Sequence, residues 1–222
     1  MKDTYLFTSE SVSEGHPDKI CDQISDAIVD AYLGKSETKD DVRVACETLV
    51  TTNKVIIAGE VRGPEIKIEE QESIVRNVVK NIGYEQDNFH WKEFDFNSFL
   101  HKQSVDIAQG VDSNDSRTEG AGDQGIMFGY ACTETKEFMP APIQYSHQIL
   151  KVLSELRKKG KVPGILPDSK SQVTLIYEDE KPIGCDNIVI STQHQQGVTS
   201  KNIFDYVYPI IEEVLPKNWI PP

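Results

Sequence analysis

The chain has 222 residues, 38% of them hydrophobic and 27% charged, which is enough apolar mass for one large core or two smaller ones. Its 23 lysines and arginines against 36 acidic residues give a formal net charge of −13, which argues against nucleic acid as a partner because cationic side chains bind the phosphate backbone. No apolar run approaches the roughly 20 residues of a membrane span, and the amino terminus lacks the apolar core of a secretory signal. We therefore expect a cytoplasmic protein that does not associate with a membrane.

The first hundred residues alternate between helical and strand patterns. Apolar residues at three- and four-residue spacing predict a helix over Pro17–Leu33. Apolar and β-branched runs predict a hairpin of two strands, Val42–Thr51 and Lys54–Val61. A second amphipathic helix is predicted over Ile68–Ile82, and a strand is predicted around Trp91–Phe99.

The pattern is interrupted between about Gln103 and Glu119, where the sequence is polar and has no periodicity. A loop of this length within a compact chain is typically a functional lid or a disordered segment. Beyond it the sequence predicts a strand, an amphipathic helix, a hairpin and a final helix. Their expected ranges are Gly125–Cys132, Ile143–Lys158, Val173–Tyr177 with Asn187–Thr192, and Ser200–Leu215.

A hairpin followed by a loop and an amphipathic helix occurs twice, at Val42–Ile82 and at Val173–Leu215. Two copies of one unit indicate an α+β fold of repeated modules, each a mostly antiparallel sheet with helices on one face. We therefore expect an amino-terminal domain at residues 1–101, a loop and linker at 102–119, and a second α+β domain at 120–222 that is incomplete.

The segment Ser9–Lys19 brings hydroxyls, a glycine, a histidine and an acid to a helix start, where free backbone N–H groups can meet an anion. His16 can donate a hydrogen bond to a phosphate oxygen, and Asp18 can bind magnesium. The same residues also suit a purely structural role, in which Ser13 and Asp18 cap the helix and His16 lies on the surface.

Two further segments have residues suited to a ligand. Three glycines within Gly120–Gly125 permit close approach of the backbone, and Asp123 can bind an ammonium group, although the segment matches neither a Walker loop nor a dinucleotide fingerprint. Lys170 offers a point charge for phosphate, and Asp168 an acceptor for a ribose hydroxyl or an adenine amine. Read alone, the first segment is better explained by a turn and the second by a solvated turn.

Two carboxylates fall on the first predicted hairpin, Glu47 in the middle of one strand and Glu60 near the end of the other. Glu47 lies in an otherwise apolar run, although strand alternation can place it on the solvent face. A buried carboxylate at this place requires a cation.

The chain resembles the S-adenosylmethionine synthetase family from Leu6 to Trp219, because six motifs occur in that family's order and spacing. The motif GAGDQG is a specific signature of the family. The six motifs are SEGHPDK at Ser13–Lys19, RVACET at Arg43–Thr48, KQS…QGVD at Lys102–Asp112, GAGDQG at Gly120–Gly125, PAPI at Pro140–Ile143 and SQVT at Ser171–Thr174.

The resemblance implies synthesis of S-adenosylmethionine from ATP and L-methionine, with Mg²⁺ and K⁺ as cofactors. It also implies three similar α+β domains, a homodimer or dimer of dimers with active sites between subunits, and a mobile loop at residues 103–113. The implied roles are catalysis for His16 and Lys170, ATP binding for His16, Asp168, Ser169 and Lys170, methionine binding for Glu60, Gln103 and Asp123, magnesium binding for Asp18 and potassium binding for Glu47.

The chain departs from the family pattern in two respects. The family's second glycine-rich signature, GGGAFSGKD, and the cationic residues of its third domain are absent, so we expect a fragment or a truncated product that cannot complete a site alone. Ser169 stands where alanine is common. Two other hypotheses stay open, namely a non-catalytic truncated subunit that binds a full-length synthetase or its ligands, and an unrelated α+β phosphate-binding enzyme.

Overall fold

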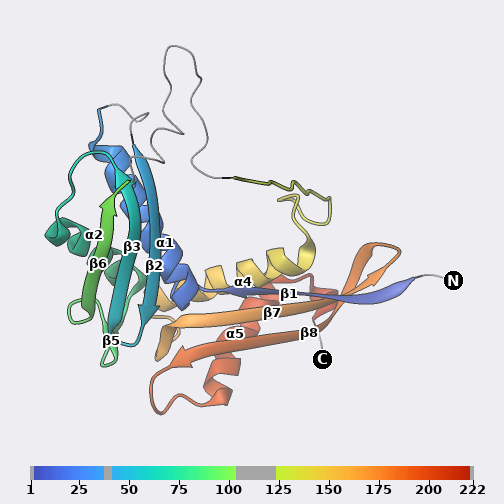
Figure 1. Ribbon diagram of the computed structural model, residues 1–222. Coiled ribbons are helices and arrows are strands. Elements are labelled where there is room, and N and C mark those ends of the chain that lie inside the picture. The colour runs from blue at the N-terminus through green and yellow to red at the C-terminus, as the bar shows by residue number, and fades with distance from the viewer. Residues whose placement is uncertain (1–2, 38–41, 104–123, 221–222) are drawn as a thin grey trace, which may run out of the picture. The chain divides into compact units, whose positions relative to one another are not determined.

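The computed structural model describes residues 3–37, 42–103 and 124–220 (Figure 1). They form two compact units. Unit 1 gathers the described parts of residues 1–19, 82–84 and 130–222, and unit 2 those of residues 20–81 and 85–129. Within the described ranges, no helix is both long and apolar enough to cross a bilayer.

Unit 1 is built on an antiparallel sheet of three strands in the order β1-β7-β8. These strands are β1 (Thr4–Val12), β7 (Ile165–Glu178) and β8 (Lys181–His194). Figure 1 shows the blue β1 running beside the orange β7, so segments from opposite ends of the chain are neighbours. The sequence analysis did not predict β1, because its half-polar sequence pairs only with a strand more than 150 residues away.

One face of this sheet is covered by helices α4 (Ala141–Lys158) and α5 (Ser200–Val214), and the short 3₁₀ helix η2 (Lys217–Trp219) follows. Alternate residues of a strand point to opposite faces, so Val173 and Leu175 enter this core while Lys170 stays exposed on the other face. The core residues shared by the helices and the sheet include Ile149, Leu150, Leu153, Val173, Leu175, Tyr177 and Ile210.

Unit 2 contains a second three-stranded sheet, ordered β2-β3-β6, in which β2 and β3 are antiparallel and β6 runs parallel to β3. Buried residues such as Ile28, Ile57 and Val79 fill the space between this sheet and the two helices. The elements of the unit are α1 (Pro17–Lys35), β2 (Arg43–Thr51), β3 (Lys54–Arg62), α2 (Ile68–Ile82), β4 (Glu85–Gln86), β5 (Phe89–His90) and β6 (Asp95–Lys102).

The predicted α+β class is confirmed, and the repeated hairpin and helix occur as β2–β3–α2 and β7–β8–α5. Two strand predictions were inaccurate. The strand expected at Trp91–Phe99 begins only at Asp95. The strand expected at Gly125–Cys132 is absent, because this apolar run has no partner strand among the described residues and its side chains are largely exposed. The boundary placed at residues 102–119 stays a prediction.

Candidate functional site

The turn between β1 and α1, residues 13–16, is held against β7 in unit 1. Ser13 N donates a 2.8 Å hydrogen bond to the Ser169 carbonyl and so prolongs the β1–β7 pairing. The Ser13 hydroxyl donates to the Pro167 carbonyl and accepts from Ser169 N, both at 2.8 Å. A Cβ on Gly15 would lie 2.4 Å from Pro167 Cβ, so this close approach requires glycine. The backbone of the turn therefore has little freedom.

His16 ends this turn with its imidazole partly exposed. Its Nδ1 accepts a 3.3 Å hydrogen bond from the backbone N–H of Asp18. In the neutral ring the proton is then on Nε2, which makes Nε2 the hydrogen-bond donor. The Asp18 carboxylate lies 3.8 Å from the same Nδ1 and is 87% exposed, which leaves its oxygens accessible to a cation.

Asp168 and Lys170 lie two residues apart on β7 and on the same face of the strand. Partial burial raises the pKa of Asp168 above its ordinary value, and the nearby charges of His16 and Lys170 oppose this increase without cancelling it. The Lys170 Nζ lies 3.6 Å from Oε1 of Glu10 on the neighbouring strand. The structure thus brings His16, Asp168 and Lys170 together in one unit.

Ser169 faces the opposite side of β7. Its side chain is buried, and its hydroxyl lies 2.7 Å from the hydroxyl of Thr192 on β8. Its backbone N–H and carbonyl are both bonded to Ser13, so the predicted contact of Ser169 with ATP stays a prediction. The sequence analysis assigned no role to Glu10, although it lies in the motif-bearing segment and is paired with Lys170.

Glu47 and Glu60 lie on the same exposed face of the unit 2 sheet. The register pairs Glu47 with Ala58 and Glu60 with Ala45, so the two carboxylates are diagonal neighbours on one face. Glu47 is exposed, which settles the alternative between a buried and a solvent-facing position. Glu60 Oε1 lies 3.6 Å from His101 Nε2. We call this surface the open face of unit 2.

The open face also displays large apolar side chains among its charges. Leu49 is 53% exposed and Phe99 is 62% exposed. Glu47 pairs in register with Ala58 on β3, and Ala58 pairs with Phe99 on β6, so Leu49 and Phe99 lie on the same face of the sheet as the carboxylate. A carboxylate in such surroundings can bind a cation if a further surface covers it.

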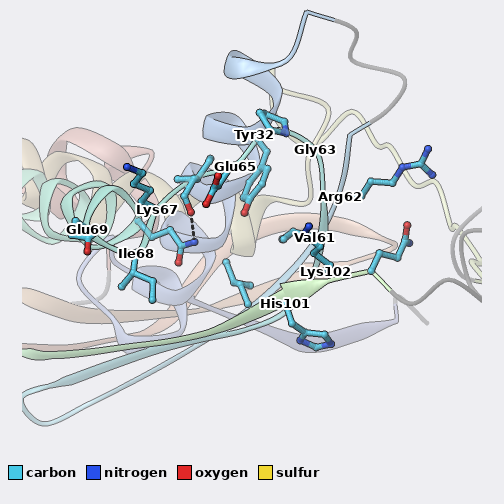
Figure 2. Close-up of a pocket in the computed structure, with 15 residues that line it drawn as sticks. Tyr32, Val61, Arg62, Gly63, Glu65, Lys67, Ile68, Glu69, His101 and Lys102 are labelled. Carbon is cyan, nitrogen blue, oxygen red and sulfur yellow. Dashed lines mark hydrogen bonds between the residues drawn. The ribbon is translucent and has the colours of Figure 1, made fainter.

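Gln103 follows β6 and is one of the residues that line a cavity of about 880 Å³ in unit 2. Figure 2 shows this cavity. Its N–H donates to the Val61 carbonyl at 3.0 Å, and its Oε1 is buried without a hydrogen-bond partner in the described part of the chain. In Figure 2 the ring of Tyr32 and the side chain of Lys102 belong to the same cavity lining. Glu60 does not line this cavity, and Asp123 lies outside the described residues.

The residues expected to hold metals do not form a preassembled centre. In residues 3–37, 42–103 and 124–220 there is no group of three or more His, Cys, Asp or Glu side chains placed to hold an ion. Magnesium commonly uses one or two carboxylates and completes its shell with water and substrate phosphates, and the accessible Asp18 carboxylate fits that pattern.

Comparison with known proteins agrees with this arrangement of motifs. The model of the S-adenosylmethionine synthetase N-terminal domain matches residues 4–105, and that of the central domain matches residues 118–221. The S-adenosylmethionine synthases of Maricaulis maris (strain MCS10) and Parvibaculum lavamentivorans are each 57% identical to the chain, and that of Rhodospirillum centenum is 55% identical. Each of these alignments covers the whole chain and 56% of the relative, so the chain spans about half the length of the curated relatives it matches. The chain therefore belongs to the S-adenosylmethionine synthetase family and carries that family's amino-terminal and central domains.

Proposed function

We propose that this chain is part of an enzyme that makes S-adenosylmethionine from ATP and L-methionine. The methionine sulfur would attack C5′ of the ribose, and the departing triphosphate would then be hydrolysed to phosphate and diphosphate. The observation that carries the proposal is the grouping of His16, Asp168 and Lys170 in unit 1, although about 150 residues separate His16 from the other two.

The chemistry of the first step matches what these residues offer. A thioether is nucleophilic without losing a proton, so the step needs neither a general base nor a covalent nucleophile. The barrier is lowered by aligning the sulfur with C5′ and by stabilising negative charge on the leaving triphosphate. In this proposal, the Nε2–H of His16 donates to the departing phosphate oxygen and Lys170 contributes a positive charge.

The remaining contacts with the nucleotide follow from the same face of β7. Asp168 would accept a hydrogen bond from a ribose hydroxyl or the adenine amine, and Ser169, which lies between Asp168 and Lys170, would belong to the same ATP site. Asp18, whose carboxylate is accessible, would bind Mg²⁺. Bound Mg²⁺ would supply positive charge that neutralises the triphosphate oxygens.

Methionine and potassium are assigned to residues of unit 2 and of the segment that follows it. Glu60, Gln103 and Asp123 would bind methionine, and Glu47 would bind K⁺. The partnerless buried Oε1 of Gln103 supports a role in ligand binding, because an ammonium donor would satisfy an acceptor whose desolvation is otherwise uncompensated. The exposed apolar residues beside Glu47 support a site that is completed by another surface.

That other surface is proposed to be a second subunit. Apolar residues are exposed on the open face of unit 2, and also on the unit 1 sheet, where Leu6 is 57% exposed and Val189 is 47% exposed. Association in a homodimer or a dimer of dimers, with active sites between subunits, would remove these residues from water. Because ATP is the proposed substrate, the expected compartment is the cytoplasm.

The test is an assay of the full-length protein that contains this chain. We expect S-adenosylmethionine, detected by mass spectrometry, together with inorganic phosphate, from ATP and methionine in the presence of Mg²⁺ and K⁺. Failure of the folded full-length protein to make S-adenosylmethionine under these conditions would overturn the proposal.

A second candidate stays open, in which a polypeptide of these 222 residues is a non-catalytic subunit. This subunit would bind a full-length synthetase or its ligands. Isothermal titration of the 222-residue chain with ATP and methionine, run beside the product assay, distinguishes the two. Binding without turnover by this chain supports the second candidate, whereas turnover excludes it.

A further inference from the structure

A set of side chains outside the predicted site holds the turn that carries His16. Glu14 Oε1 accepts a 2.8 Å hydrogen bond from Arg157 Nη2, and Glu14 Oε2 accepts a 2.7 Å bond from Lys158 Nζ. The Ser154 hydroxyl also donates to Glu14 Oε1. All three donors belong to the last turns of α4, so the end of this helix holds the turn through one carboxylate.

Arg157 connects the turn to the segment 82–84 of the same unit. Its side chain is only 12% exposed, and its Nη2 also donates to the Ile82 carbonyl at 2.7 Å. Gly83 has a φ of +101°, and a Cβ there would lie 2.8 Å from Arg157 Nη1, so glycine makes room for the guanidinium. The neighbouring Tyr84 donates its hydroxyl proton to the Gly15 carbonyl. We refer to Glu14, Arg157 and Tyr84 together as the turn clamp.

The charges of the turn clamp are stable at neutral pH. Burial raises the pKa of Glu14, but the hydrogen bonds and charges of Lys158, Ser154 and Arg157 bring it below its ordinary value. A guanidinium group carries its positive charge throughout the physiological range. Burial and the charge of Asp168 raise the pKa of Tyr84, so its hydroxyl keeps the proton that it donates. The bonds to Glu14 are thus charge-assisted, the stronger class of hydrogen bond.

Every residue of the turn is therefore fixed by a different contact. Ser13 is held by β7, Glu14 by Arg157, and Gly15 by Tyr84, while His16 N donates to the Ser13 carbonyl at 3.1 Å. Loss of the Glu14–Arg157 pair would release the turn on the side facing α4. A displacement of about 1 Å in a reacting group can slow a reaction by about 100-fold, because the transition state tolerates little misalignment.

We propose that Glu14 and Arg157 are positioning residues that fix the imidazole of His16 toward the leaving phosphate. The pair acts on the rate of the chemical step and leaves the affinity for both substrates nearly unchanged. This inference rests on the function proposed above. If the pair served only to anchor the fold, its removal would lower the stability of the enzyme and would leave the kcat of the folded enzyme unchanged.

The experiment uses the full-length enzyme with Glu14→Gln, Arg157→Met, Arg157→Lys and the double variant Glu14→Gln/Arg157→Met. We expect kcat to fall about 10- to 100-fold in each glutamine or methionine variant, with both KM values within about 3-fold of the parent. Arg157→Lys keeps the charge but not the two-pronged geometry, so its kcat should be intermediate. The double variant should be no slower than the slower single variant, because both substitutions remove one interaction.

The matched control is Lys159→Met, which removes a charge from the same helix end. Lys159 is 65% exposed and pairs only with Glu155 at 3.7 Å, so kcat should not change. All assays are run well below the unfolding temperature of each variant. Should Glu14→Gln fail to fold, Arg157→Lys decides the question alone.

The direct readout is ¹⁵N NMR of histidine-labelled enzyme. In the parent, we expect His16 to show one tautomer with the proton on Nε2, and in the two single variants we expect averaged or broadened ring signals. If the parent is active, three results would overturn the positioning role. The folded variants would keep the kcat of the parent, or the losses of kcat in the single variants would add up in the double variant. Alternatively, kcat would fall while the His16 signals stayed unchanged. An inactive parent overturns the proposed function instead, so the two failures are distinguishable.

Discussion

The two units hold their predicted functional residues in different ways. In unit 1, the turn that carries His16 is bound to β7, to α4 and to Tyr84, and Lys170 lies on a strand between two others. In unit 2, Glu47 is exposed on the open face, and the Glu60 carboxylate lies 3.6 Å from His101 Nε2. The predicted site residues of unit 1 are thus fixed by contacts within the unit, whereas Glu47 and Glu60 of unit 2 are held less firmly.

Removal of the reactive group of unit 1 should have the largest effect. We expect His16→Ala in the full-length enzyme to lower kcat by about 10²- to 10³-fold, because one well-placed stabiliser of developing charge is lost. The KM for methionine should change little. Steady-state kinetics measure both values, and His194→Ala, an exposed histidine on β8, is the matched control. An unchanged kcat would remove His16 from the mechanism.

The rigidity of the turn in unit 1 can be tested by adding one methyl group. Gly15→Ala places a Cβ 2.4 Å from Pro167 Cβ, which should lower the free energy of unfolding by about 1–3 kcal/mol. Gly34→Ala is the opposite control in α1. Apart from its own helix, no atom of the described residues lies within 4 Å of its Cβ, and alanine favours a helix by about 0.5–1 kcal/mol. Urea titration should show that the free energy of unfolding falls in Gly15→Ala and rises in Gly34→Ala. The same change in both variants would contradict the close packing of the turn.

A substitution on the open face of unit 2 should affect ligand binding and leave the fold intact. We expect Glu60→Gln to raise the KM for methionine by roughly 10-fold or more, because a charge-assisted hydrogen bond to the substrate would be lost. The unfolding midpoint should stay close to that of the parent, since the side chain is partly exposed and weakly held. Glu93→Gln, at an exposed position away from the sheet, is the control. A large fall in stability with normal KM would show that Glu60 is structural.

The smallest expected effect concerns the dependence of stability on pH. The pKa of Glu14 in the folded protein lies below its ordinary value of 4.5, so the unfolded chain binds a proton more readily. The stabilisation from the turn clamp is fully present above pH 4.5 and is lost as the pH falls through the lowered pKa. Unfolding free energies measured from pH 6 downward should therefore fall more steeply in the parent than in Glu14→Gln. Parallel curves would show that the Glu14 carboxylate adds no pH-dependent stability.

The local parts of the fold were predictable because their signals lie within short windows. The periodicity of α1 and α2, and the β-branched runs of β2 and β3, depend only on which neighbouring residues must share a buried face. The apolar run at 125–132 shows the limit of this reasoning, since hydrophobicity without a partner strand does not make a strand. Strand β1 shows the converse, because its half-polar sequence becomes a strand through pairing with β7.

The candidate site likewise has residues that the sequence pointed to and residues that only the structure revealed. The motifs pointed to His16, Asp18, Asp168 and Lys170 as candidates, because the chemistry of phosphate and metal binding restricts which side chains serve. Their roles stay predictions. Neither Arg157 nor Tyr84 was singled out, since each acts through a contact with a residue far away in the sequence.

The amino-acid sequence by itself determined the α+β class, the repeated hairpin and helix, and the family to which the chain belongs, because periodicity and motif spacing are local properties of the chain. Only the tertiary structure decided that the first strand pairs with β7 and that the end of α4 holds the turn before His16. Such pairings are selected by the burial and hydrogen bonding of the whole folded unit, which bring together residues separated by more than a hundred positions.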